Sequence, residues 1–197
     1  MNSRERILEA VRRQQPAGLS LPELPDLQAD APATLEAFAA ALKRMGGQFV
    51  QPEPGQTLHD LVKTCHPDAA VVVSATPELP GTRALPATYE PGELEDVDVG
   101  VVRAAFGVAE TGSVFLSERE FRVNALGFLP QHLVVLLDPA SLLPGLQHAY
   151  RHAGFFEARY AVLMTGPTAT ADIEGILIRG AQGVRSLTVI AWPAQGH

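Results

Sequence analysis

Apolar residues along the chain follow two spacings. In some segments they recur every three or four positions, which places them on one face of an α-helix. These segments are the N-terminal stretch that begins at Asn2, and residues 34–45, 57–65, 141–152 and 170–179. In other segments the apolar residues are consecutive, or alternate with polar residues, over a few positions, as in β-strands. These are residues 48–50, 68–74, 99–108, 112–117, 133–137, 160–164 and 187–192.

Helical and strand patterns alternate, which is typical of an α/β fold. The run Ala69 to Val73 has no polar position, as in a parallel strand covered on both faces. The short gap between residues 99–108 and 112–117 indicates a hairpin or a bent strand. We predict one three-layer α/β domain with a mostly parallel sheet.

The first 32 residues have a different character. Asn2 and Glu5 have the spacing of a helix capping box, and Ile7, Leu8 and Val11 line one helical face. Four prolines then fall between Gln15 and Pro32, a density that sustains neither a helix nor a central strand. We therefore expect an N-terminal helical arm and linker over residues 1–32, and the α/β domain over residues 33–197.

Composition narrows the function classes. The chain has 197 residues, 46% of them hydrophobic, and a formal net charge of −7. Such a charge argues against a nucleic-acid partner, because phosphate binding needs clustered Lys and Arg. The sequence contains no apolar run of the roughly 18 residues that span a membrane and no signal-peptide core, so the expected compartment is the cytoplasm.

The chain has one cysteine, Cys65, within the helical apolar series of residues 57–65. One thiol forms no internal disulfide and cannot hold an iron–sulfur cluster, which takes about four cysteine ligands. No G-x-G-x-x-G fingerprint is present. We interpret Cys65 as a small buried apolar residue and expect no cofactor in this chain.

Two segments carry candidate chemistry. In the first, Glu110 stands between two apolar runs and is followed by Thr111, Gly112 and Ser113. A carboxylate at such a junction is either a nucleophile or general base, or a structural group that accepts hydrogen bonds from turn amides.

The second segment, residues 164–174, follows an apolar strand pattern and reads Met-Thr-Gly-Pro-Thr-Ala-Thr-Ala-Asp-Ile-Glu. We expect a tight turn at Gly166 and Pro167, then a helix over residues 170–179. Thr168 or Thr170 would cap that helix, and Asp172 would lie near its first turn, where the helix dipole favours negative charge.

Other polar clusters give weaker signals. His148 and His152 have the i, i+4 spacing of two metal ligands on one helix, but no third ligand is evident. The acidic residues between Glu90 and Asp98 are typical of a solvated loop. We predict no metal site.

The two candidate segments resemble a known family. Ala109 to Ser113 is similar to the AETGT-type motif of the LUD-domain proteins, and Thr165 to Glu174 is similar to their TGPSxTADIE motif. Gly180 to Gly183 resembles their GVHGP turn, with departures at Gln182, Val184 and Ala169. The resemblance is to the lactate utilisation protein C (LutC/YkgG) type.

This resemblance implies a fold of the NagB/RpiA/CoA-transferase type. It also implies a role in the oxidation of L-lactate to pyruvate, together with iron–sulfur partner proteins. For such a component we expect a small anionic or nucleotide-like ligand. The alternatives are a standalone enzyme related to CoA transferases or isomerases that uses Glu110 as nucleophile or base, and a scaffold that binds no ligand.

In an open α/β sheet, ligands bind outside the carboxyl ends of the strands. We therefore expect both segments to meet at one sheet edge and to form one pocket, with Glu110 as the catalytic candidate. The residues expected to bind the ligand are Thr111, Gly112, Ser113, Thr165, Gly166, Thr168, Thr170 and Asp172.

Overall fold

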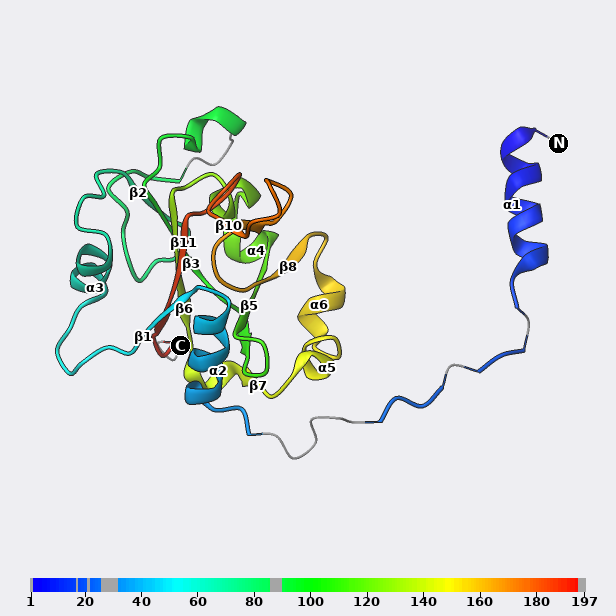
Figure 1. The fold of residues 1–197 in the computed structure, drawn as a ribbon, viewed down its shortest axis with the longest axis horizontal. Helices are drawn as coiled ribbons and strands as arrows, with labels where there is room; N and C mark the ends of the chain where they lie inside the picture. Colours follow the sequence, from blue (N-terminus) through cyan, green and yellow to red (C-terminus); the bar gives the residue numbers. More distant parts are fainter. Residues whose placement is uncertain (1, 17, 21, 26–31, 86–89, 195–197) are drawn as a thin grey trace.

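The computed structural model describes residues 2–16, 18–20, 22–25, 32–85 and 90–194. Part of the predicted linker (residues 17, 21 and 26–31) lies outside these residues, as do residues 86–89. Figure 1 shows a layered body and, far from it, the N-terminal helix.

The centre of the body is a parallel sheet, as the apolar runs predict. It has five strands in the order β1-β11-β6-β3-β2, and every neighbouring pair is parallel. Its strands are β1 (Gln48–Val50), β2 (Val72–Ser74), β3 (Val99–Arg103), β6 (His132–Leu137) and β11 (Ser186–Ala191). The mostly parallel α/β architecture is therefore confirmed.

A second sheet lies beside the first and was not predicted from the sequence. It has four strands in the order β7-β4-β5-β8. These are β4 (Phe106–Val108), β5 (Ser113–Ser117), β7 (Leu142–Leu143) and β8 (Ala161–Met164). β4 and β5 form an antiparallel pair, so the expected hairpin is confirmed, and the chain crosses from the first sheet to the second at Ala104 and Ala105.

The helices of the body cover the two sheets and the space between them (Figure 1). They are α2 (Leu35–Arg44), α3 (Leu58–Cys65), α4 (Glu118–Phe121), α5 (Leu146–Ala149) and α6 (Ala153–Glu157), whereas α1 (Ser3–Gln14) is the separate N-terminal helix. Three 3-10 helices complete the body: η1 (Pro91–Leu94), η2 (Asn124–Gly127) and η3 (Pro139–Ser141). α2 and α3 confirm the helical segments predicted over residues 34–45 and 57–65, and Thr34 and Thr57 cap them, each accepting from the N–H three residues on.

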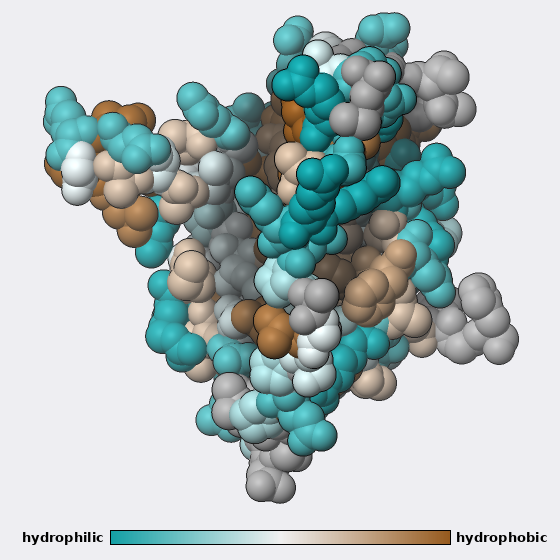
Figure 2. Space-filling view, turned by 90° about the vertical axis from the view of Figure 1, so that its right-hand side faces the viewer, coloured by the Kyte–Doolittle hydropathy of each residue, from teal (hydrophilic) through white to brown (hydrophobic). Residues whose placement is uncertain are grey.

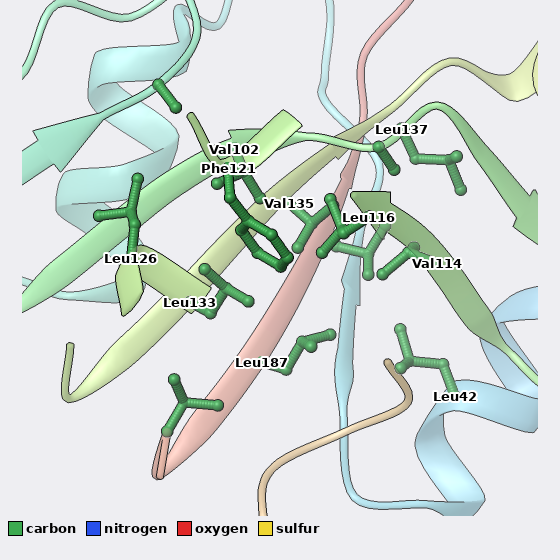
Figure 3. Close-up of a cluster of buried hydrophobic side chains, with 14 of the residues drawn as sticks. Leu42, Val102, Val114, Leu116, Phe121, Leu126, Leu133, Val135, Leu137 and Leu187 are labelled. Carbon is green, nitrogen blue, oxygen red and sulfur yellow. The ribbon is translucent and has the colours of Figure 1, made fainter. Parts of the chain in front are cut away.

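The largest apolar cluster fills the space between the two sheets. Figure 3 shows Leu133 and Val135 of β6 and Leu187 of β11 facing Leu116 of β5 and Phe121 of α4. A second cluster packs α3 on the opposite face of the parallel sheet, and a third lies under α5 and α6 on the outer face of the second sheet. The parallel sheet is thus buried on both faces, as its continuous apolar strands require.

Two predicted helices are wrong. Residues 170–179 form the antiparallel hairpin of β9 (Ala169–Thr170) and β10 (Ile178–Arg179), because Glu174 and Gly175 both have positive φ, which no right-handed helix accommodates. Residues 141–152 hold β7 and only the short helix α5, because Pro144 lacks the N–H that a helix through it would need.

The N-terminal helix α1 forms with the predicted capping box between Asn2 and Glu5. None of its residues is buried, and Ile7 and Val11 are 64% and 53% exposed. Elsewhere, exposed brown patches in Figure 2 are separated by hydrophilic side chains, so that face carries no single continuous apolar surface. Within the described residues, no helix has the length and apolar character needed to cross a membrane.

Candidate functional site

Glu110 lies in the turn between β4 and β5 and is tied to the start of α5. Its carboxylate accepts the N–H of Leu146 at 2.9 Å, and its own N–H donates to the Pro144 carbonyl at 3.0 Å. The side chain is exposed. This is the geometry of the structural alternative, in which the carboxylate accepts from a turn amide.

Three hydroxyls join the two sequence motifs. Thr111 Oγ1 lies 2.8 Å from Ser113 Oγ, and Ser113 Oγ makes a short hydrogen bond with Thr165 Oγ1. Ser113 is at the start of β5 and Thr165 directly follows β8, its antiparallel neighbour. The expectation that the two motif turns meet is therefore correct for Thr111, Ser113 and Thr165.

The glycines of the two motifs allow the turns to approach helix α2. A Cβ on Gly112, at φ +68°, would lie 2.2 Å from the backbone nitrogen of Leu42. A Cβ on Gly166, at φ +69°, would lie 2.5 Å from the Met45 carbonyl oxygen. Both positions thus require glycine for packing as well as for conformation.

The rest of the second motif runs into the β9–β10 hairpin. The backbone N–H of Thr168 donates to the Val184 carbonyl, and the Thr168 carbonyl accepts the N–H of Gly180. Thr170 Oγ1 accepts the Asp172 N–H at 3.2 Å, so Thr170 caps a turn and not a helix. Asp172 is exposed, and the helix whose dipole was expected to favour its charge is absent.

A cavity of about 790 Å³ lies at the carboxyl edge of the parallel sheet. Residues that follow β2, β3, β6 and β11 line it, together with residues of α4. This is the edge where open α/β sheets bind ligands. None of the motif residues predicted to bind a ligand lines this cavity. Its lining residues are Ala75, Thr76, Pro77, Glu78, Arg103, Ala104, Ala105, Arg119, Glu120, Arg122, Asp138, Ser141 and Ala194.

Arg103 lines the cavity and is hydrogen-bonded to two other parts of the chain. Its Nε donates to Glu78 Oε1 at 2.6 Å, and its Nη1 donates to the Trp192 carbonyl at 3.0 Å. Thr76 is 7% exposed, and its hydroxyl oxygen is buried with no hydrogen-bond partner among the described residues. A buried hydroxyl left in this state costs about 1–3 kcal/mol.

Sequence reasoning missed this cavity, although a signal for it was present. Thr76, Arg103 and Asp138 each come at or just after the end of an apolar run, where a parallel strand delivers its next residues to the carboxyl edge. The contribution of α4 had no such signal, because the sequence pattern did not predict that helix.

His148 and His152, which have the spacing of two metal ligands, belong to two different short helices. His148 lies in α5, and His152 caps α6 through Nδ1, which accepts the Gly154 N–H. Among the described residues, no group of three or more His, Cys, Asp or Glu side chains is placed to hold a metal ion.

A different histidine pair lies at the opposite, amino edge of the parallel sheet. The rings of His66 and His132 stack with centroids 4.4 Å apart, and His132 Nδ1 lies 2.8 Å from Ser186 Oγ. Burial lowers the pKa of both imidazoles below the ordinary value. The neighbouring Cys65 is half-buried, and burial raises the pKa of its thiol, as expected for an inert packing residue.

The acidic residues before β3 serve local structure. Asp96 forms a two-fold hydrogen-bonded ion pair with Arg83, with 2.9 Å at each contact. Asp98 Oδ2 accepts the N–H groups of Ala70 and Val71, both at 2.8 Å. The Arg83 guanidinium holds the pKa of the Asp96 carboxyl below its usual range.

Comparison with known proteins places these features in context. A family profile described as "LUD domain" matches residues 92–191, half of the chain. "Uncharacterized protein YkgG" of Escherichia coli is 32% identical over 97 residues, which cover 46% of this chain and 42% of that protein. "Lactate utilization protein C" of Geobacillus thermodenitrificans is 28% identical over 95 residues, 45% of this chain and 40% of that protein. The matched segment thus spans less than half the length of these relatives.

One solved structure shares the fold. A DUF162 family protein from Deinococcus radiodurans superposes with a TM-score of 0.61 over 80% of this chain and 94% of that one, at 16% sequence identity. The matched family region begins before β3 and ends with β11. It therefore contains both sequence motifs and most of the residues that line the cavity.

Proposed function

The chain belongs to the LUD domain family, and on that premise we propose that it is a component of an L-lactate utilisation system. The observation that carries this proposal is the match to proteins named for lactate utilisation, such as the Geobacillus thermodenitrificans relative. The matched region holds the two motifs whose turns meet at Ser113 and Thr165.

Oxidation of L-lactate to pyruvate releases two protons and two electrons, so it needs an electron acceptor. Cys65 is the single cysteine of the chain, and one thiol cannot ligate an iron–sulfur cluster. We therefore propose that iron–sulfur partner proteins carry the electrons and that this chain holds no cofactor of its own.

The β9–β10 hairpin offers a surface for such a partner. Ile173 at the end of the second motif and Ile176 and Leu177 just after it are 48%, 62% and 59% exposed in the turn between β9 and β10. Exposed apolar groups gathered in this way are typical of protein contact surfaces. We therefore assign the turn of this hairpin to partner contact.

The alternative, a standalone enzyme with Glu110 as nucleophile or base, has less support. The Glu110 carboxylate accepts the Leu146 N–H and is not among the cavity-lining residues. The side chains of Thr111, Ser113 and Thr165 hydrogen-bond one another. Ligand binding by the motif residues stays a prediction.

The test is genetic and biochemical. Deletion of the gene in its host should abolish growth on L-lactate and leave growth on pyruvate intact, and the wild-type gene should restore it. An affinity-tagged chain from lactate-grown cells should retain proteins that contain iron and acid-labile sulfide. Normal lactate consumption by the deletion strain would contradict the proposal.

A further inference from the structure

We propose that the cavity at the carboxyl edge of the parallel sheet binds an organic phosphate that carries hydroxyl groups. The cavity is lined by three carboxylates and three guanidinium groups, so the count of charges favours neither sign. The hydrogen bonds decide, because they show which of these charges already have partners.

All three carboxylates are engaged within the fold. Glu78 pairs with Arg103, and Glu120 Oε2 accepts both the N–H and the hydroxyl of Ser117. Asp138 accepts the N–H groups of Ala140 and Ala194, one on each carboxylate oxygen. The acidic side of the cavity is therefore satisfied without a cation.

Two of the three guanidinium groups are available. Arg119 pairs with Glu157 at 3.0 Å, but both side chains are more than half exposed, and such surface pairs are weak. Arg122 is exposed and has no hydrogen-bond or ion-pair partner within the described part of the chain. The uncommitted charge at the cavity is therefore positive, and it favours an anion with several acceptor oxygens.

Arg122 also occupies a strained backbone position. It ends α4 with φ +57° and ψ −41°, a region that costs free energy for any residue except glycine. A glycine would fit this helix end without strain. An arginine in that place, with no side-chain partner among the described residues, is available for a contact outside the chain.

The remaining polar groups of the cavity favour a ligand that carries hydroxyl groups beside its phosphate. Thr76 lines the cavity, and its buried hydroxyl has no hydrogen-bond partner among the described residues. Each Asp138 oxygen accepts one hydrogen bond from the fold and has capacity for a second, from a ligand hydroxyl. Small apolar residues such as Ala75, Pro77 and Ala105 also line the cavity.

The size of the cavity favours a nucleotide over a smaller acid. A volume of about 790 Å³ is in the range that holds drug-sized ligands, so L-lactate alone would leave most of it empty. The inference goes beyond the proposed role in lactate utilisation, and a chain without a growth phenotype can still bind a nucleotide. The two failures are therefore distinguishable.

Isothermal titration calorimetry of the full chain with AMP and ribose 5-phosphate tests the proposal. We expect saturable 1:1 binding, tighter for AMP, and weaker or no binding for adenosine, inorganic phosphate and L-lactate. Arg122→Gln should weaken AMP binding about tenfold or more, as expected when a charged hydrogen bond is lost. Thr76→Val, which keeps the side-chain shape, should weaken it several-fold.

Two further variants serve as controls for the binding experiment. Arg185→Gln removes an exposed arginine just before β11, at the opposite edge of the sheet, and should leave the affinity unchanged. Arg122→Gly removes the charge at a position where glycine relieves strain, so this variant should unfold at least as late as the wild type in thermal denaturation while also losing binding. Tighter binding of ribose 5-phosphate than of AMP would identify a sugar phosphate as the source of the anion. If neither phosphate binds at millimolar concentration, or if the Arg122 variants bind as the wild type does, the proposal is wrong.

Discussion

Ser113 and Thr165, 52 positions apart in the sequence, join their side-chain hydroxyls between β5 and β8. Each belongs to one of the two family motifs, and Thr111 extends the contact by a second hydroxyl bond of 2.8 Å. The motifs are therefore joined physically, through a small hydrogen-bonded group beside helix α2.

Loss of this contact should destabilise the domain. Ser113 is 4% exposed, so Ser113→Ala leaves the Thr165 hydroxyl without its partner. We expect the free energy of unfolding to fall by about 1–2 kcal/mol for Ser113→Ala and for Thr165→Val in urea denaturation. Thr64→Val, on an exposed face of α3, is the matched control. Equal stability of all three variants would show that the hydroxyl group is dispensable.

Gly112 should tolerate no side chain. A Cβ there would meet the Leu42 backbone at 2.2 Å, so Gly112→Ala should cost about 3 kcal/mol or more. Gly55 also has positive φ, +86°, but its Cβ would enter open space. Gly55→Ala should therefore cost only about 1 kcal/mol, the price of the left-handed conformation. Thermal unfolding of both variants separates the cost of the steric clash from the cost of the left-handed conformation. Similar losses of stability in the two variants would contradict the close approach of Gly112 to α2.

Glu110 should act through structure. Glu110→Gln keeps an oxygen that can accept the Leu146 N–H, so it should support growth on L-lactate as well as the wild type does. Glu110→Ala removes that acceptor and should lower the free energy of unfolding by about 1 kcal/mol. An inactive, stably folded Glu110→Gln variant would instead favour the enzyme alternative, in which the carboxylate reacts.

Stability should fall in mild acid because of the stacked histidines. Burial lowers the pKa of His66 and His132, with Arg185 lowering that of His132 further and Asp98 opposing it. The unfolded chain, with imidazoles titrating near about pH 6.5, then binds protons first as the pH falls. The free energy of unfolding should decrease below that pH.

Urea denaturation between neutral pH and mild acid measures this effect. His66→Gln should reduce the pH dependence, since it removes one of the two half-buried, stacked imidazoles. His59→Gln, on the exposed face of α3, should leave it unchanged. A pH dependence identical in wild type and His66→Gln would exclude the pair as its source.

The N-terminal arm should be separable from the domain. No residue of α1 is buried, and the hydrogen bond from Gln147 to the Pro25 carbonyl of the linker is exposed. A chain that begins at Ala33 should therefore keep its free energy of unfolding within about 0.5 kcal/mol. A larger loss would place the arm in the core of the domain.

Local patterns predicted most elements of the body. The apolar runs identified β6 and β11, and Thr34 and Thr57 marked the starts of α2 and α3. Prediction failed over residues 170–179, where Ile173, Ile176 and Leu177 have helical spacing but are exposed in a hairpin. A helical spacing indicates a buried face only when the fold supplies a surface to cover it, and here none does.

The sequence by itself determined the α/β class, the parallel sheet and the two motifs, because these depend on the spacing and identity of neighbouring residues. Only the tertiary structure decided that Ser113 bonds Thr165, that Glu110 is held by α5, and that the cavity lies beside Thr76, Arg103 and Arg122. Those residues come from separate strands and from α4, and the fold brings them together. The crossing of the chain into a second sheet at Ala104 and Ala105 sets those distances, and no local pattern encodes it.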